Sequence, residues 1–387
     1  MKKNVAIIIN SLKAGGAERV VSILLNELGN ECNMHLILLC NEKEYAVPSS
    51  TTCFSLNEPL IEPEYKRLLR IPDQAKKINR YCSDNKIDVV LSFLNRPCYI
   101  AAMMRRKYDF PGKIIMCERT FQSYMLERRS ALYRIFTKRL LQWAYAKADL
   151  ILANYVAIKE DLLQLFNLKK TITVIYNPIV LNEVTEKASK PVDYCFDANC
   201  FYFVTVGGLR PEKNQSLLID AFSMLKELPC KLIMVGTGPM ESVLKDKVKV
   251  LELQNNVVFT GLDNNPFRYV NKCQCFVLSS DVEGFPNVLL EALACSRSII
   301  STDCNSGPRE LLAPETAAFK RVQSGYETVS HGILTPVKNT AALADAMIRM
   351  YKDNTLRNEL ENTALNRARQ FDVSVIMDDY RKVILRQ

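Results

Sequence analysis

The chain has 387 residues, of which 48% are hydrophobic and 24% are charged, and its formal net charge at pH 7 is +9. This length exceeds the roughly 250 to 300 residues that one hydrophobic core usually serves, so two domains are expected. The composition excludes disordered and collagen-like chains. No apolar run approaches the roughly 18 residues that a membrane-spanning helix requires.

Thirteen cysteines are scattered along the chain. The one tight pair, Cys273 and Cys275, lacks a second pair or a histidine cluster that would complete a zinc site. The two histidines, His35 and His331, are too few for histidine-based metal or triad chemistry. The first apolar run ends by Asn10, too early for a signal peptide. We therefore expect a reduced, cytoplasmic protein that needs no metal or other cofactor.

Short apolar runs typical of buried parallel strands alternate with helical patterns along the chain. In the first half, the predicted strands are 4–10, 35–40, 88–93, 113–117 and 149–153, and the predicted helices are 17–28 and 73–84. In the second half, the predicted strands are 201–207, 230–236, 256–260, 275–279 and 299–302, and helices are predicted over 215–225 and from 288.

This alternation predicts an α/β fold of two facing Rossmann-like domains, each with a parallel sheet, and a ligand cleft between them. We expect residues 1–178 to form an N-terminal domain and residues 179–370 a C-terminal domain. Residues 371–387 are expected to form a C-terminal helix that packs back on the first domain. The polar stretch 182–199 is interpreted as a linker and loop.

The most informative motif places Glu283 just after the strand 275–279 and Glu291 in the helix that follows. Open α/β sheets bind ligands at the carboxyl ends of their strands, and the free N–H groups near Asn287 and Val288 suit a diphosphate. Eight residues make about 2.2 helical turns, so we expect Glu291 to return to nearly the same face as Glu283. For an isolated pair, two solvated glutamates are the commoner explanation.

Two further loops join a strand to a helix. Gly15 and Gly16 follow the first strand and allow the backbone to approach an anion, although a tight turn is the alternative. The loop from Gly207 to Asn214 supplies flexible backbone and a lysine, Lys213, close to a helix start. A cation is unfavourable beside the positive end of a helix dipole, so Lys213 at this position suggests an anionic ligand. A solvated loop lysine is the commoner explanation. The dinucleotide-binding spacing of glycines is absent.

In combination these motifs resemble the retaining family-4 glycosyltransferases, which have the GT-B architecture. The resemblance covers nearly the whole chain. The segments that carry it are Gly15 to Arg19, Asn177 to Ile179, Gly207 to Asn214, and the Glu283/Glu291 pair. Two later segments, Ser306 to Glu310 and His331 to Leu334, look like members that build bacterial surface polysaccharides.

The resemblance implies that residues 1–178 form the acceptor-side domain and that residues 179–370 form the nucleotide-sugar-binding domain with the donor site. Glu283 would hold hydroxyls of the donor hexose, Glu291 the ribose and Lys213 the phosphates. Gly208 stands where the family usually has an arginine, so Arg210 or Arg309 is expected to supply that phosphate contact. The remaining donor-binding positions are Gly15, Gly16, Gly284, Phe285, Pro286, Asn287 and Val288.

The acceptor side departs from the family pattern, because Cys117, Glu118 and Arg119 replace a segment in which many members carry a histidine. In a retaining front-face reaction the leaving diphosphate can take the acceptor's proton, while Lys213 stabilises its charge. Glu118 would then act catalytically by orienting the acceptor, or it forms a structural ion pair with Arg119. Glu18 is assigned to the acceptor side as well, with an exposed first helical turn as the alternative.

The excess of positive residues is concentrated in one segment of the chain. From Arg96 to Lys147 there are twelve Lys or Arg and three Asp or Glu, an excess equal to that of the whole chain. Within it, the stretch 127–147 alternates cations and apolar residues, which predicts a basic amphipathic helix on an anionic membrane surface. The alternative is a helix whose apolar stripe faces the core. Nucleic acid is not expected as a partner. The cations assigned to the acceptor and membrane side are Arg119, Arg128, Arg129, Arg134 and Lys138.

The resemblance thus implies a retaining, metal-independent glycosyltransferase at the inner face of the cell membrane. It would move a hexose or N-acetylhexosamine from a UDP-sugar to a polyprenyl-diphosphate-linked saccharide in surface-glycan assembly. Two alternatives remain: a UDP-sugar epimerase of similar fold, and a catalytically silent sugar-binding or scaffold protein.

Overall fold

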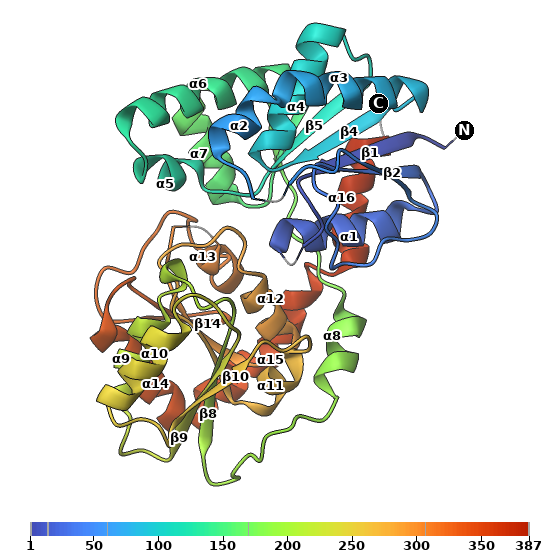
Figure 1. Ribbon diagram of the computed structural model, residues 1–387. Helices are drawn as coiled ribbons and strands as arrows, with labels where there is room; N and C mark the ends of the chain where they lie inside the picture. Colours follow the sequence, from blue (N-terminus) through green and yellow to red (C-terminus); the bar gives the residue numbers. More distant parts are fainter. Residues whose placement is uncertain (1, 14, 60, 169, 306, 386–387) are drawn as a thin grey trace. The chain divides into compact units, whose positions relative to one another are not determined.

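The computed structural model describes residues 2–385 apart from positions 14, 60, 169 and 306. The chain divides into two units, Met1–Pro178 with Ser374–Gln387, and Ile179–Val373 (Figure 1). Each unit contains one seven-stranded sheet. This architecture agrees with the predicted α/β fold of two Rossmann-like domains. The second crossing between the units lies after residue 373, whereas the sequence suggested residue 370.

The sheet of the first unit is parallel throughout, with strand order β3-β2-β1-β4-β5-β6-β7. Its strands are β1 (Asn4–Ile9), β2 (Asn33–Leu38), β3 (Thr52–Ser55), β4 (Val89–Phe93), β5 (Lys113–Glu118), β6 (Leu150–Ala153) and β7 (Ile172–Val174). Residues 5–9 are fully buried because helices cover both faces, which explains the continuous apolar run. The edge strands β3 and β7 were not predicted, since each is short and carries few apolar residues.

The helices of this unit lie on both faces of the sheet, with α3, α4 and α6 side by side on one face in Figure 1. They are α1 (Gly16–Leu28), α2 (Glu64–Leu69), α3 (Ile71–Asp84), α4 (Asn95–Tyr108), α5 (Gln122–Glu127), α6 (Ala131–Lys147), α7 (Val156–Phe166) and the final helix α16 (Val373–Leu385). The single basic helix predicted over 127–147 is wrong. Helix α5 ends at Glu127, and α6 begins after Ser130, whose hydroxyl caps it by accepting the Tyr133 N–H at 3.4 Å.

The last helix, α16, packs on the first unit. The ammonium of Lys113 donates to the backbone carbonyl of Val383 at 2.9 Å, and Arg381 forms an ion pair with Glu31 at 2.8 Å. Tyr380 is fully buried on the inner face of this helix. The end of the chain therefore completes the unit in which it begins.

The second sheet has the order β10-β9-β8-β11-β12-β14-β13, and only the β13–β14 pair is antiparallel. Its strands are β8 (Phe201–Val206), β9 (Cys230–Val235), β10 (Val257–Gly261), β11 (Cys275–Leu278), β12 (Ser298–Thr302), β13 (Glu327–Val329) and β14 (Gly332–Thr335). Its helices are α8 (Leu181–Ala188), the 3-10 turn η1 (Pro211–Lys213), α9 (Gln215–Ser223), α10 (Glu241–Val250), α11 (Phe267–Lys272), α12 (Asn287–Ala294), α13 (Pro308–Leu312), α14 (Thr340–Lys352) and α15 (Asn354–Arg369).

The interpretation of 182–199 as a linker and loop is wrong in its first part, because α8 occupies Leu181–Ala188 and buries Val184 and Ala188. One core layer lies between the sheet and helices α9, α10 and α14, where Phe203, Phe222 and Met347 are fully buried. Each such side chain contributes about 1.5 to 3 kcal/mol relative to exposure.

Both sheets have a point where the strand order reverses: between β1 and β4 in the first unit, and between β8 and β11 in the second. The loops that leave neighbouring strands there run to opposite faces, which opens a crevice at the carboxyl ends of the strands. Candidate sites are therefore expected at these two points. Of the described helices, none combines the length and apolar character needed to cross a bilayer.

Candidate functional site

At the reversal point of the second sheet, the loops after β8 and β11 bring two predicted residues together. The ammonium of Lys213 lies 2.7 Å from both carboxylate oxygens of Glu283. The Glu283 side chain is 6% exposed and the Lys213 side chain 27%. Seventy residues separate them along the chain, so the sheet topology creates this cation–anion pair.

Neighbouring side chains hold both residues in place. Ser279 Oγ donates to the Lys213 carbonyl at 3.0 Å, and Ser280 Oγ donates to Glu283 Oε1 at 2.6 Å. Asn214, in the left-handed region at φ 46°, donates its amide to Asp281 at 2.9 Å and caps α9. The two serines were not singled out from the sequence. Their signal was their place directly after β11, next to Glu283.

A second glycine loop packs beneath the first. At Gly236, φ is 138°, and a β-carbon there would overlap the carbonyl oxygen of Gly207. Gly238 similarly leaves room for the backbone of Leu209, whose N–H donates to the Thr237 carbonyl at 2.9 Å. These contacts explain why both positions lack side chains. Neither glycine was predicted as part of the site. Their place just after β9 could have identified them from the sequence.

Arg210 and Arg309, expected to supply the phosphate contact that Gly208 lacks, lie in different surroundings. A β-carbon at Gly208 would lie 3.2 Å from Nε of Arg210, so the exposed Arg210 side chain passes over this position. Arg309 is 1% exposed and donates to Asp303 at 2.6 Å and Glu327 at 2.8 Å. The suggestion that Arg309 binds phosphate is wrong, because its guanidinium is bound to two carboxylates inside the domain.

The region between the two glutamates differs from the predicted geometry. Helix α12 begins at Asn287, so Glu283 lies in the preceding loop and the argument from helical spacing is wrong. Gly284, Asn287 and Val288 are partly exposed, whereas Phe285, Pro286 and Glu291 are buried. No side chain caps the first turn of this helix among the described residues. The prediction of a free N–H at Asn287 is wrong, because this group donates to the Phe285 carbonyl at 2.8 Å.

The glycine pair of the first unit shapes a turn around Glu18. Gly15 has extended backbone at φ −177°, but a side chain there would overlap the Glu18 carboxylate. Burial raises the pKa of Glu18. Glu18 is thus half-buried against the turn rather than fully exposed, and Gly16 begins α1.

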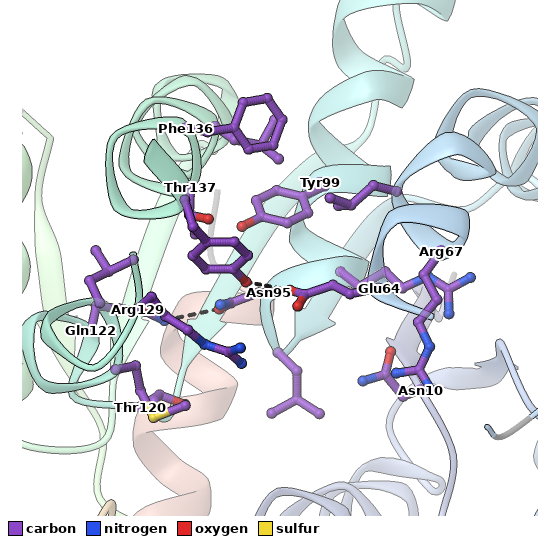
Figure 2. Close-up of a pocket in the computed structure, with 17 residues that line it drawn as sticks. Asn10, Glu64, Arg67, Asn95, Tyr99, Thr120, Gln122, Arg129, Phe136 and Thr137 are labelled. Carbon is purple, nitrogen blue, oxygen red and sulfur yellow. Dashed lines mark hydrogen bonds between the residues drawn. The ribbon is translucent and has the colours of Figure 1, made fainter. Parts of the chain in front are cut away.

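A cavity of about 480 Å³ lies at the reversal point of the first sheet (Figure 2). Asn10, Asn95 and Thr120 border it just after β1, β4 and β5. Polar and apolar side chains from α2, α4, α5, α6 and the residues next to these helices complete the wall: Glu64, Arg67, Leu68, Leu94, Arg96, Tyr99, Gln122, Met125, Leu126, Arg129, Tyr133, Phe136, Thr137 and Leu140.

The cavity wall has two notable features. The hydroxyl of Tyr133 on α6 donates to Glu64 on α2, which joins the two helices across the cavity (Figure 2). Leu94 has φ 74° and ψ 162°, a region that is essentially restricted to glycine. Such backbone costs about 1 to 3 kcal/mol and clusters at functional sites.

Glu118 is 3% exposed and is not among the residues that line the cavity. Its carboxylate accepts the backbone N–H groups of Arg119 and Thr120 at 2.8 and 2.9 Å, the Gln122 amide at 3.0 Å, and the Tyr145 hydroxyl. Burial raises the pKa of Glu118, and these hydrogen bonds oppose that effect. The position is a buried anchor beneath the cavity, not a group at its surface.

The alternative ion pair between Glu118 and Arg119 is wrong. The Arg119 guanidinium instead donates to Asn177 and, at 2.7 Å, to the Tyr380 hydroxyl, and it lies 5.0 Å from the centre of the Phe93 ring. These contacts tie α16 to the sheet. Arg119 is thus engaged within the first unit and does not line the cavity.

The basic residues around α6 lie mostly at the surface. Arg128 and Arg129 stack on Tyr124 and Tyr133, with ring-centre distances of 4.8 and 5.0 Å, and Arg129 also borders the cavity. Arg134 is exposed and Lys138 half-buried. The first half of α6 exposes its apolar residues, including Leu132 at 84%, whereas the second half packs inward. The alternative, a helix whose apolar stripe faces the core, therefore holds only for the second half of α6.

All thirteen cysteines are free. In the part of the chain that the structure describes, there is no group of three or more His, Cys, Asp or Glu side chains that could hold a metal ion. The sequence prediction of metal independence stays a prediction.

Comparison with known proteins places these features in a family. A family model described as Glycosyltransferase Family 4 matches residues 14–183, and one described as Glycosyl transferases group 1 matches residues 190–367. The N-acetylgalactosamine-N,N'-diacetylbacillosaminyl-diphospho-undecaprenol 4-alpha-N-acetylgalactosaminyltransferase of Campylobacter jejuni is 34% identical over 99% of this chain and 100% of its own length. This chain is a glycosyltransferase of that family. The predicted family is confirmed, and the assignment favours transfer over the epimerase alternative.

Other relatives of this glycosyltransferase are more distant. The GalNAc-alpha-(1->4)-GalNAc-alpha-(1->3)-diNAcBac-PP-undecaprenol alpha-1,4-N-acetyl-D-galactosaminyltransferase of C. jejuni is 24% identical, with 98% of each chain covered. The crystal structure of Anabaena HepE in complex with UDP has a TM-score of 0.77 at 19% identity, covering 99% of this chain and 100% of that one. Likeness at this identity shows the shared GT-B fold alone.

Proposed function

We propose that this glycosyltransferase moves an N-acetylhexosamine or hexose from a UDP-sugar to a polyprenyl-diphosphate-linked saccharide, with retention of the anomeric configuration and without a metal ion. The observation that carries the proposal is the Lys213–Glu283 pair at the reversal point of the second sheet. The names of the two C. jejuni relatives, both acting on undecaprenyl-linked saccharides, support the acceptor class.

On the donor side, the diphosphate of a nucleotide sugar competes with Glu283 for the ammonium of Lys213. Once the phosphate takes this cation, the Glu283 carboxylate accepts hydrogen bonds from hydroxyls of the sugar. Arg210 and the backbone N–H groups of Gly284 and Val288 add positive potential around the diphosphate, and Glu291 holds the ribose. The UDP complex of HepE supports the choice of uridine.

The reaction breaks the bond between the anomeric carbon and the diphosphate oxygen, and it forms the new glycosidic bond on the same face of the sugar. The proton of the acceptor hydroxyl passes to the leaving diphosphate, so no histidine base is required. Lys213 stabilises the negative charge that develops on the departing phosphate oxygen. The products are UDP and the extended lipid-linked saccharide.

On the acceptor side, the cavity of the first unit takes the saccharide. Arg67 and Arg129 in its wall supply cations for the lipid diphosphate. The helices that border it expose apolar side chains: Tyr65 and Leu69 on α2, and Leu132, Ile135 and Phe136 on α6. Together with the cations around α6, these residues form a surface suited to the inner face of an anionic membrane, where the acceptor lipid resides.

The function is tested by incubating the purified protein with UDP-sugars, with and without a polyprenyl-diphosphate-linked saccharide. We expect mass spectrometry to show one added sugar only when both substrates are present, and NMR to show retention at the new linkage. Conversion of the UDP-sugar to an epimer without acceptor, or no transfer to any lipid-linked saccharide, would overturn the proposal. Thermal stabilisation by UDP-, GDP-, ADP- and dTDP-sugars identifies the base, since ligand at 100 times its Kd adds about 2.7 kcal/mol.

A further inference from the structure

Two amide side chains in the cavity of the first unit form an ordered pair. Nε2 of Gln122 donates to Oδ1 of Asn95 at 2.9 Å (Figure 2). The same nitrogen donates to Glu118 at 3.0 Å. Both hydrogens of the Gln122 amide are thereby used. Among the described residues, Nδ2 of Asn95 and Oε1 of Gln122 have no hydrogen-bond partner, although both side chains line the cavity. The pair therefore offers one donor and one acceptor to a ligand.

Glu118 fixes this orientation from beneath. An ionised carboxylate can only accept hydrogen bonds, so Gln122 must turn its nitrogen towards Glu118. The second hydrogen of that nitrogen then requires the oxygen of Asn95, which leaves the Asn95 nitrogen as a donor. Two backbone N–H groups and the Tyr145 hydroxyl hold the Glu118 carboxylate still. One buried charge thus sets the polarity of two amides.

The backbone next to the pair is strained. Leu94, directly before Asn95, has φ 74° and ψ 162°, which side chains other than glycine rarely adopt. This conformation precedes the first turn of α4 and sets the place of Asn95 at the end of β4. Strain of this kind persists where surrounding contacts impose it, and it clusters at binding sites.

From this geometry we infer that Asn95 and Gln122 recognise the acetamido group of an acceptor sugar, with Glu118 as a positioning residue. An acetamido group carries one N–H and one carbonyl oxygen, so it pairs with Oε1 of Gln122 and Nδ2 of Asn95 together. A phosphate diester or dianion has no hydrogen to give to Gln122, and a hydroxyl must serve both partners from one oxygen atom, whereas an acetamido group serves them from two separate atoms. The inference rests on the proposed function, whose acceptor site it refines.

The test compares two lipid-linked acceptors that differ only at C2 of the terminal sugar, one carrying an acetamido group and the other a hydroxyl. We expect the wild-type protein to prefer the acetamido acceptor by at least about tenfold in kcat/KM, because a buried polar group left unpaired is costly. Asn95→Asp replaces the donor with an oxygen and should reduce this preference to near unity. Glu118→Gln should do the same by releasing the Gln122 amide.

Asn33→Asp is the matched control. The side-chain amide of Asn33 donates a 2.9 Å hydrogen bond to the side-chain oxygen of Asn4, at the opposite end of the sheet. This variant should keep the wild-type preference. Circular dichroism checks folding, and Gln122→Met provides a neutral variant should Asn95→Asp fail to fold. Equal use of both acceptors by the wild type, or an unchanged preference in folded variants at Asn95 and Gln122, would overturn the inference while leaving the proposed transfer intact. No transfer to either acceptor would overturn both.

Discussion

Nζ of Lys213 lies at the same distance, 2.7 Å, from the two carboxylate oxygens of Glu283. The pair joins the loops after β8 and β11, the two neighbouring strands at which the second sheet reverses its order. Each charge thus lies against an opposite charge. A diphosphate sugar can separate the pair, because its phosphates suit the lysine and its hydroxyls suit the glutamate.

The first prediction is that Lys213→Ala and Glu283→Ala each lower kcat/KM by roughly 100- to 1,000-fold, since loss of a charged transition-state contact costs about 2.7 to 4 kcal/mol. Steady-state transfer assays measure the effect. Lys245→Ala is the control, because Lys245 forms an ion pair of equal length, 2.7 Å, with Glu241 on the surface of α10. Near-normal turnover in a folded Lys213 or Glu283 variant would remove that residue from the reaction.

The second prediction concerns Arg210, which lies over Gly208. Arg210→Ala should weaken UDP binding roughly 10- to 100-fold, because hydrogen bonds to charged groups contribute about 1.5 to 3 kcal/mol. Isothermal titration calorimetry gives the Kd. Adding Gly208→Arg to this variant should restore much of the affinity, since it places a guanidinium on the same loop. Unchanged UDP affinity in Arg210→Ala would mean that this side chain does not contact the phosphates.

The third prediction is that transfer does not depend on a divalent ion, because Lys213, Arg210 and the start of α12 supply positive charge around the diphosphate. Rates measured in EDTA, and after addition of Mg²⁺ or Mn²⁺, should agree within error. Loss of activity in EDTA with recovery on adding either ion would contradict the mechanism proposed here.

The fourth prediction places the protein on anionic membranes through the surface around α6. Binding to vesicles rich in acidic phospholipid should weaken as salt rises, because the Debye length falls from about 10 Å at 0.1 M to about 3 Å at 1 M. Cosedimentation measures the bound fraction. Replacing four cations with glutamine should release the protein while leaving its UDP affinity unchanged: Arg128, Arg129, Arg134 and Lys138.

A matched variant removes the same number of charges from exposed positions of the second unit, namely Lys226, Lys245, Lys249 and Lys272. It should bind vesicles nearly as well as the wild type. If both variants lose binding equally, net charge rather than the α6 surface is responsible. If the wild type does not bind at low salt, the membrane assignment fails.

The fifth prediction follows from the buried Glu118, whose folded-state pKa is raised above its ordinary value of 4.5, chiefly by burial. The folded protein therefore holds this proton to higher pH than the unfolded chain. Its contribution to stability is present at low pH and is lost as pH rises through the folded-state pKa. Glu118→Gln lacks this loss, so its free energy of unfolding relative to wild type should increase with pH above 4.5. Urea unfolding between pH 4.5 and 7.5 tests this, and a constant difference would refute it.

Much of the donor half could be predicted from the sequence, because its signals are local. Continuous apolar runs identified β8 and β11, and Lys213 and Glu283 lie in the loops that follow these strands. The predicted helical spacing of Glu291 failed for a local reason as well: α12 begins after Pro286, so three of the seven intervening positions are not helical.

The acceptor half depended on tertiary structure. Glu118 looks like a surface catalytic carboxylate in the sequence, yet Tyr145, 27 residues away, and Gln122 enclose it. Arg309 looks like a phosphate ligand, yet Asp303 and Glu327 neutralise it inside the second unit. The amino-acid sequence determined most of the strands, although not the short edge strands β3 and β7, since continuous apolar runs are local properties. Only the tertiary structure decided which charges meet a partner, because partners come from distant loops and burial makes each unpaired charge costly.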